Sequence, residues 1–96
     1  RALALADASL AGRRAARAYV VRADALRRLG RIDPALEAID AALKANPAYA
    51  PAWELKGKIL WSARRYDEAR PAFQQFLKLQ PTGEAADTAR SLLGPT

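Results

Sequence analysis

Apolar residues along this chain recur every three or four positions, which is the spacing of one face of an α-helix. Between residues 15 and 29, for example, the stripe consists of Tyr19, Ala23, Leu26 and Leu29. No segment alternates apolar and polar residues for long enough to predict a strand. Ala, Leu, Arg, Glu and Lys, which dominate the sequence, are good helix formers. The pattern therefore predicts an all-α fold.

Glycine, proline and aspartate divide this pattern into helix-sized pieces. Gly12 and Gly30 are expected to end helices, and Asp33 and Asp67 are expected to be N-caps. Pro71 falls about one turn inside its piece, where a proline removes a backbone hydrogen bond or bends the helix. The breakers predict six helices, at about residues 1–11, 15–29, 34–46, 48–62, 67–80 and 83–93. Loops of roughly two to four residues make each helix antiparallel to its neighbour.

The chain also repeats itself with a period of 34 residues, the distance between Pro47 and Pro81. The matched pairs at this offset are Tyr19 and Trp53, Leu26 and Leu60, Ile32 and Tyr66, Ala35 and Ala69, Ile39 and Phe73, and Leu43 and Leu77. Such a period indicates a supersecondary unit that cannot cover its apolar face alone and stacks on a copy of itself. Stacked units offer surfaces rather than enclosed active sites.

The second copy carries an aromatic residue, a small residue, an alanine and a proline at fixed separations: Trp53, Gly57, Leu60, Ala69, Phe73 and Pro81. This pattern resembles the tetratricopeptide repeat, a helix–turn–helix unit of about 34 residues. The resemblance implies a right-handed superhelical α-solenoid of antiparallel helix hairpins. It divides the chain into the second helix of a truncated preceding repeat (1–13), two full repeats (14–48 and 49–82) and a C-terminal capping helix (83–96). We interpret the chain as a piece of a longer protein, with Ala and Arg usage typical of bacteria.

Four small residues are expected to let helices approach closely: Ala23, Gly57, Ala35 and Ala69. The bulky Tyr19 and Trp53 are expected to bury their rings between units, because an aromatic side chain buries ~150–250 Å². Burial of this size stabilises the fold, so a structural role is favoured over ligand stacking for both rings.

The chain departs from the family pattern at two pairs of equivalent positions and at Arg14, which stands in place of the proline expected after the first piece. Arg22 and Lys56 stand where the family usually carries leucine, so we expect these positions to be less buried. Gly30 has no glycine counterpart, because Arg64 stands at the equivalent position.

The composition removes most catalytic and metal-binding chemistry. The chain has no Cys and no His, which excludes thiol chemistry, disulfides and the commonest metal ligands. Asp33, Glu37 and Asp40 follow one helix face and are interpreted as solvated, while Asp67 and Glu68 suit a helix N-terminus. There is no glycine-rich phosphate loop. The sequence predicts a protein that is not an enzyme and holds no cofactor or metal.

What remains is surface. In tetratricopeptide arrays the first helix of each unit lines a concave groove that holds a peptide or a helix of a partner protein. The resemblance implies a groove lined here by Arg17, Val20, Val21, Asp24, Arg28, Glu54, Leu55, Lys58, Trp61, Ser62 and Thr88. Trp61 has two interpretations, because its ring can face the groove or pack on the next helix. The leading hypothesis is a non-catalytic interaction module or scaffold whose protein partner can be acidic.

One kind of partner is argued against by particular residues. Co-chaperones of this family hold the acidic carboxyl-terminal tails of heat-shock chaperones with Lys, Asn and Arg side chains. The matching positions here are Val20, Asp24, Leu55, Ala85 and Ala89. None supplies such a donor, and Asp24 would repel a carboxylate. We predict that the chain does not bind these tails.

A second hypothesis is electrostatic binding of nucleic acid or another polyanion. The formal net charge is +6, and seven arginines lie between Arg13 and Arg31, offset there only by Asp24. Such a cluster suits phosphate groups. No recognised nucleic-acid motif accompanies it, and arginines on solvated helix faces are the favoured explanation of the charge. Nucleic acid is therefore the less favoured partner.

A third hypothesis is self-association. Leu3, Leu5 and Leu10 would form an exposed apolar patch if no helix precedes them, and such patches drive assembly. No apolar run approaches the ~20 residues needed to span a bilayer. A cytoplasmic location is favoured, and a periplasmic one is expected if the longer protein carries a signal.

Overall fold

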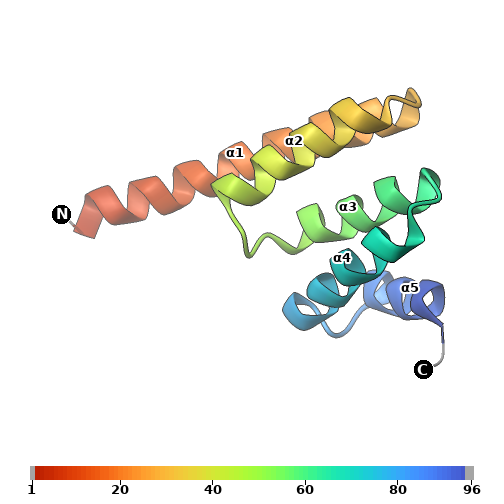
Figure 1. Ribbon diagram of the computed structural model, residues 1–96. Helices are drawn as coiled ribbons and strands as arrows, with labels where there is room; N and C mark the ends of the chain where they lie inside the picture. Colours follow the sequence, from red (N-terminus) through yellow and green to blue (C-terminus); the bar gives the residue numbers. More distant parts are fainter. Residues whose placement is uncertain (1, 95–96) are drawn as a thin grey trace.

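The computed structural model describes residues 2–94 and the side chains of residues 12–94 (Figure 1). Its helices are α1 (Ala2–Arg28), α2 (Ile32–Ala45), α3 (Ala50–Ser62), α4 (Tyr66–Leu79) and α5 (Glu84–Leu93). Loops of three or four residues connect them, within the expected range. Residues 2–94 contain no strand, so the prediction of an all-α fold is confirmed.

Two stacked helical hairpins make up the molecule. α1 pairs with α2, α3 pairs with α4, and α5 packs on α4 (Figure 1). One core cluster, which includes Ala23, Ile39 and Ile59, joins α1, α2 and α3. The other includes Leu60 and Phe73 and joins α3, α4 and α5. Because α3 contributes one face to each cluster, the hairpins stack into a helical repeat solenoid, as predicted.

The N-terminal part of the chain differs from the prediction. α1 runs without a break over Ala2–Arg28, so the helices expected at 1–11 and 15–29 are one, and residues 2–94 form five helices rather than six. Gly12 does not end a helix. A Cβ at this position would lie 2.6 Å from the carbonyl oxygen of Ala45, so the glycine lets α1 pass close to the end of α2. The sequence reasoning was wrong because a helix stop and a close helix contact both call for glycine.

The helix N-termini also differ in detail. Arg31 and Arg65 occupy the N-cap positions of α2 and α4, and neither makes a side-chain cap hydrogen bond. Asp33 and Asp67, the expected caps, lie inside the first turn, where a negative charge is favourable to the helix dipole. α4 continues through Pro71, which donates no hydrogen bond to the carbonyl four residues earlier.

Small residues bring the helices of each hairpin together, as predicted. A Cβ on Gly57 would lie 2.7 Å from ring carbons of Phe73, whose side chain is 1% exposed. In the first hairpin the equivalent positions hold Ala23 and Ile39, both fully buried in one core cluster. The second hairpin therefore pairs the smaller residue, Gly57, with the larger partner, Phe73. The first hairpin pairs Ala23 with the smaller Ile39.

The two bulky aromatic residues at equivalent positions have different environments. Trp53 is half-buried, and its Nε1–H donates a hydrogen bond of 2.8 Å to the carbonyl of Pro47. Tyr19 is 38% exposed, so the expectation of a buried ring is wrong for this residue. The reason is the unbroken α1, whose N-terminal part extends past α2 instead of folding back over Tyr19 (Figure 1). Arg22 is exposed and Lys56 half-buried, as expected from the polar substitutions.

The turns inside the two hairpins have the same backbone geometry. Gly30 has a φ of 79° and Arg64 a φ of 62°, both in the left-handed region. The backbone N–H after each donates to the carbonyl five residues earlier, from Arg31 to Leu26 and from Arg65 to Leu60, at 2.9 Å in both turns. This is the Schellman termination, which favours glycine because side chains are strained at positive φ.

Arg64→Gly should therefore raise the free energy of unfolding by roughly 0.5–1 kcal/mol, because it relieves the strain of a left-handed arginine. Gly30→Ala is the reciprocal control and should lower the free energy of unfolding by about 1 kcal/mol. A Cβ on Gly30 would meet no atom within 4 Å, so only the backbone conformation is tested. Urea denaturation of both variants measures the effect, and a stability loss in Arg64→Gly would contradict it.

Candidate functional site

The α1 residues of the expected groove lie one, three or four positions apart and share one helix face. Val21 is 65% exposed. Arg17 and Arg28 are exposed as well. Val20 is half-buried and packs against the first core cluster, so it contributes to the floor of this face. On this face, Val21 is therefore an open apolar side chain that lies between two cations.

The α3 and α5 residues of the expected groove are a mixed set. Lys58, Ser62 and Thr88 are exposed, and the two hydroxyls donate to carbonyls one turn earlier in their own helices. Glu54 is half-buried and lies 3.8 Å from the Lys58 ammonium. Leu55 is only 6% exposed and belongs to the core cluster that joins α1, α2 and α3. Its expected place on the groove surface is therefore wrong, because contact between α1 and α3 covers it.

Trp61 is half-buried and packs on the following helix. Its ring lies edge-to-face on Tyr66, with centroids 4.7 Å apart, and on Phe73, with centroids 6.4 Å apart. Of its two interpretations, the structure supports the packing one.

The arginines between Arg13 and Arg31 do not form one continuous patch. Asp24 holds two of them, with its carboxylate 2.8 Å from Arg27 Nη2 and 3.2 Å from Arg28 Nε. Three others line a hollow of about 600 Å³ beside the α2–α3 loop; the lining residues are Arg13, Arg14, Arg17, Asn46, Ala48 and Tyr49. None of these three forms an ion pair with the side chains of residues 12–94. This hollow suits an acidic group.

The remaining charged groups form local pairs. Arg65 Nη2 donates to Glu68 Oε1 at 2.9 Å, and Arg65 Nε donates to the other carboxylate oxygen. These hydrogen bonds lower the pKa of Glu68 and raise the pKa of Arg65, although both side chains face solvent. Among the side chains of residues 12–94, no group of three or more carboxylates is placed to hold a metal ion. No helix in the described part of the chain has the length and apolarity of a membrane span.

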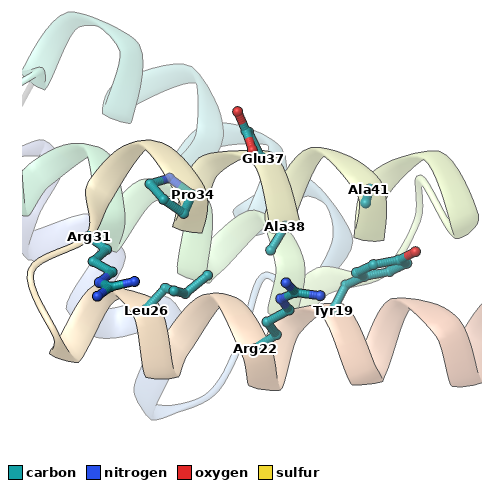
Figure 2. A pocket seen from close by; sticks show the side chains of 8 residues that line it. All are labelled: Tyr19, Arg22, Leu26, Arg31, Pro34, Glu37, Ala38 and Ala41. Carbon is teal, nitrogen blue, oxygen red and sulfur yellow. The ribbon is translucent and has the colours of Figure 1, made fainter.

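A feature that the sequence reasoning missed is a pair of equivalent hollows, one on each hairpin. The hollow of the first hairpin, of about 360 Å³, lies between α1 and α2 (Figure 2). It is lined by Tyr19, Arg22, Leu26, Arg31, Pro34, Glu37, Ala38 and Ala41. The hollow of the second hairpin, of about 410 Å³, is lined by Leu36, Asp40, Lys56, Leu60, Arg65, Asp67, Glu68 and Pro71. The recurrence of cationic and leucine positions at the repeat offset was the signal that could have revealed them.

A family model described as tetratricopeptide repeat matches residues 20–84, from the C-terminal third of α1 to the start of α5. None of the curated proteins compared with the chain matches it. Repeats of this family generally mediate protein–protein interactions or scaffolding and are typically non-catalytic. The matched region contains the C-terminal part of α1 and all of α2, α3 and α4, and equivalent residues of the two hairpins stand 34 positions apart. The chain belongs to the tetratricopeptide repeat family.

Proposed function

We propose that this chain is a protein-interaction module that holds a peptide or helix of a partner protein on the face formed by α1, α3 and α5. The observation that carries the proposal is Val21, an apolar side chain that is 65% exposed between cations on that face. A partner residue that covers Val21 would remove its apolar surface from water, which favours binding.

Charge supports a partner with acidic residues. Arg17 and Arg28 flank Val21 on α1, and Lys58 is exposed on α3. Arg17 also lines the hollow that contains Arg13 and Arg14. The acids on this face, Asp24 and Glu54, are paired with Arg28 and Lys58, so Arg17 is the cation of this face that has no acidic partner among the side chains of residues 12–94. A partner with an apolar residue near carboxylates complements this surface.

The proposal predicts that substitutions on α1 and on α3 weaken the binding of the same peptide. Peptides are selected from a random display library on the immobilised chain, and the affinity of an enriched peptide is measured by fluorescence anisotropy. Val21→Asp and Lys58→Ala should each weaken binding about fivefold, or roughly 1 kcal/mol. Circular dichroism of both variants should be unchanged, because the two side chains are exposed. Trp61 is not used, because its ring supports α4.

Arg70→Ala is the matched control, since Arg70 is an exposed cation on α4, outside the proposed face. It should leave the affinity unchanged. Equal losses in Lys58→Ala and Arg70→Ala would contradict the groove and favour non-specific charge attraction. Saturable binding of single-stranded DNA that survives moderate salt would favour the polyanion hypothesis instead, because purely electrostatic binding weakens steeply with salt.

A further inference from the structure

The two equivalent hollows differ in what covers them. In the second hairpin, α2 lies over the hollow and supplies Leu36 and Asp40 to its lining. The carboxylate of Asp40 lies 3.8 Å from the Lys56 ammonium, and Leu36 packs against the cluster that contains Leu60. Leu60 is consequently only 3% exposed. In the second hairpin this surface is thus covered by α2, which carries a leucine and, one turn later, an acidic residue.

In the first hairpin, no other helix among residues 2–94 covers the hollow. Leu26, the equivalent of Leu60, is half-buried, and Tyr19 is 38% exposed. Figure 2 shows Tyr19, Arg22 and Leu26 side by side along α1, with Arg31 at the end of the row. The apolar part of this row is open to a further helix at the position that α2 occupies one repeat later.

The charges of the first hollow are also unsatisfied. Arg22 is the equivalent of Lys56, and Arg31 is the equivalent of Arg65. Both equivalents have acidic partners, whereas Arg22 and Arg31 form no ion pair with the side chains of residues 12–94. Pro34 stands where Glu68 pairs with Arg65, which removes the local acceptor for Arg31. The nearby Glu37 is directed away from both guanidinium groups (Figure 2).

We propose that the edge hollow between α1 and α2 is a second docking site, for an amphipathic helix of a partner protein that carries a leucine and an acidic residue four positions later. The leucine covers Leu26 and Tyr19, and the acid pairs with Arg22, as Leu36 and Asp40 do in the next repeat. The site lies at the edge of the solenoid and is separate from the face proposed to hold a peptide. The two sites can therefore be occupied, and can fail, independently.

The test uses a synthetic peptide with the sequence of residues 31–46, because α2 is the helix that covers the equivalent surface. It is titrated into the isotope-labelled 96-residue chain and followed by amide chemical shifts. Saturable shifts are expected at Leu26, Arg31 and Ala38, and not at Lys58. Arg22→Glu should weaken binding about fivefold, and a peptide with lysine in place of Asp40 should restore at least half of the loss. Arg70→Glu is the charge-matched control and should bind like the wild type.

Several outcomes would overturn the proposal. Shifts centred on Lys58 would place the peptide on the other face, and failure of the charge-reversed peptide to recover affinity would remove the Arg22 contact. Sedimentation equilibrium of the free chain provides a second measurement. A dimer that Arg22→Glu converts to monomer would assign the edge to a second copy of this chain.

Discussion

Leu60→Ala should lower the free energy of unfolding by about 3 kcal/mol, whereas Leu26→Ala, at the equivalent position of the first hairpin, should lower it by about 1 kcal/mol. The two leucines are identical in chemistry and in place within the repeat. Leu60 is 3% exposed beneath α2, so its removal leaves a cavity that its neighbours cannot fill. Leu26 is half-buried at the open edge, where water enters the space that the truncated side chain leaves.

Guanidinium denaturation followed by helical circular dichroism measures both variants. The midpoints should shift with unchanged m-values, which shows that the difference lies in stability. The measurement is made at two protein concentrations, so that any association at the edge is detected. Equal losses at the two positions would mean that Leu26 is as well covered in solution as Leu60, and would contradict the open edge.

Gly57→Ala should lower the free energy of unfolding by about 2 kcal/mol, although alanine is the better helix former by about 1 kcal/mol. The added Cβ would lie 2.7 Å from ring carbons of Phe73, well inside van der Waals contact. The ring is 1% exposed and belongs to the core shared by α3, α4 and α5, so it cannot move aside without disturbing its neighbours. α3 and α4 must therefore separate.

The first hairpin suggests the compensating change. It holds Ala23 and Ile39 at the positions of Gly57 and Phe73. In a Phe73→Ile background, Gly57→Ala should be neutral or stabilising, because the ring is gone and helix propensity favours alanine. The double-mutant cycle should give a coupling energy of at least about 1 kcal/mol. Additive losses would show that the close contact between Gly57 and Phe73 is not what requires the glycine.

The repeat made most of the fold predictable from the sequence. Pairs such as Leu26 and Leu60 stand at the same offset as the prolines, and an offset of this kind specifies stacked hairpins without any knowledge of individual contacts. The helix ends at Gly30 and near Ser62 were also predictable, because the apolar stripes end there. Local patterns thus predicted the helices correctly wherever a residue in the pattern had a single structural explanation.

The errors share a physical cause. Gly12 could end a helix or allow a close contact, and only the position of Ala45 distinguishes the two. Tyr19 has the sequence environment of Trp53, but its burial depends on whether a helix crosses it. Leu55 was placed on the groove by family resemblance, while contact between α1 and α3 buries it. Each property belongs to the packing of distant segments and is absent from the local pattern.

The position of α3 between two cores has a consequence for how the molecule opens. Its Ile59 faces one cluster and its neighbour Leu60 the other, so α3 is held by the hairpin before it and by the helices after it. Opening of a repeat array starts at its ends, where an element has a neighbour on one side only. Detachment of α5 or of the N-terminal end of α1 leaves α3 in place, and its backbone amides should be the last to exchange with solvent.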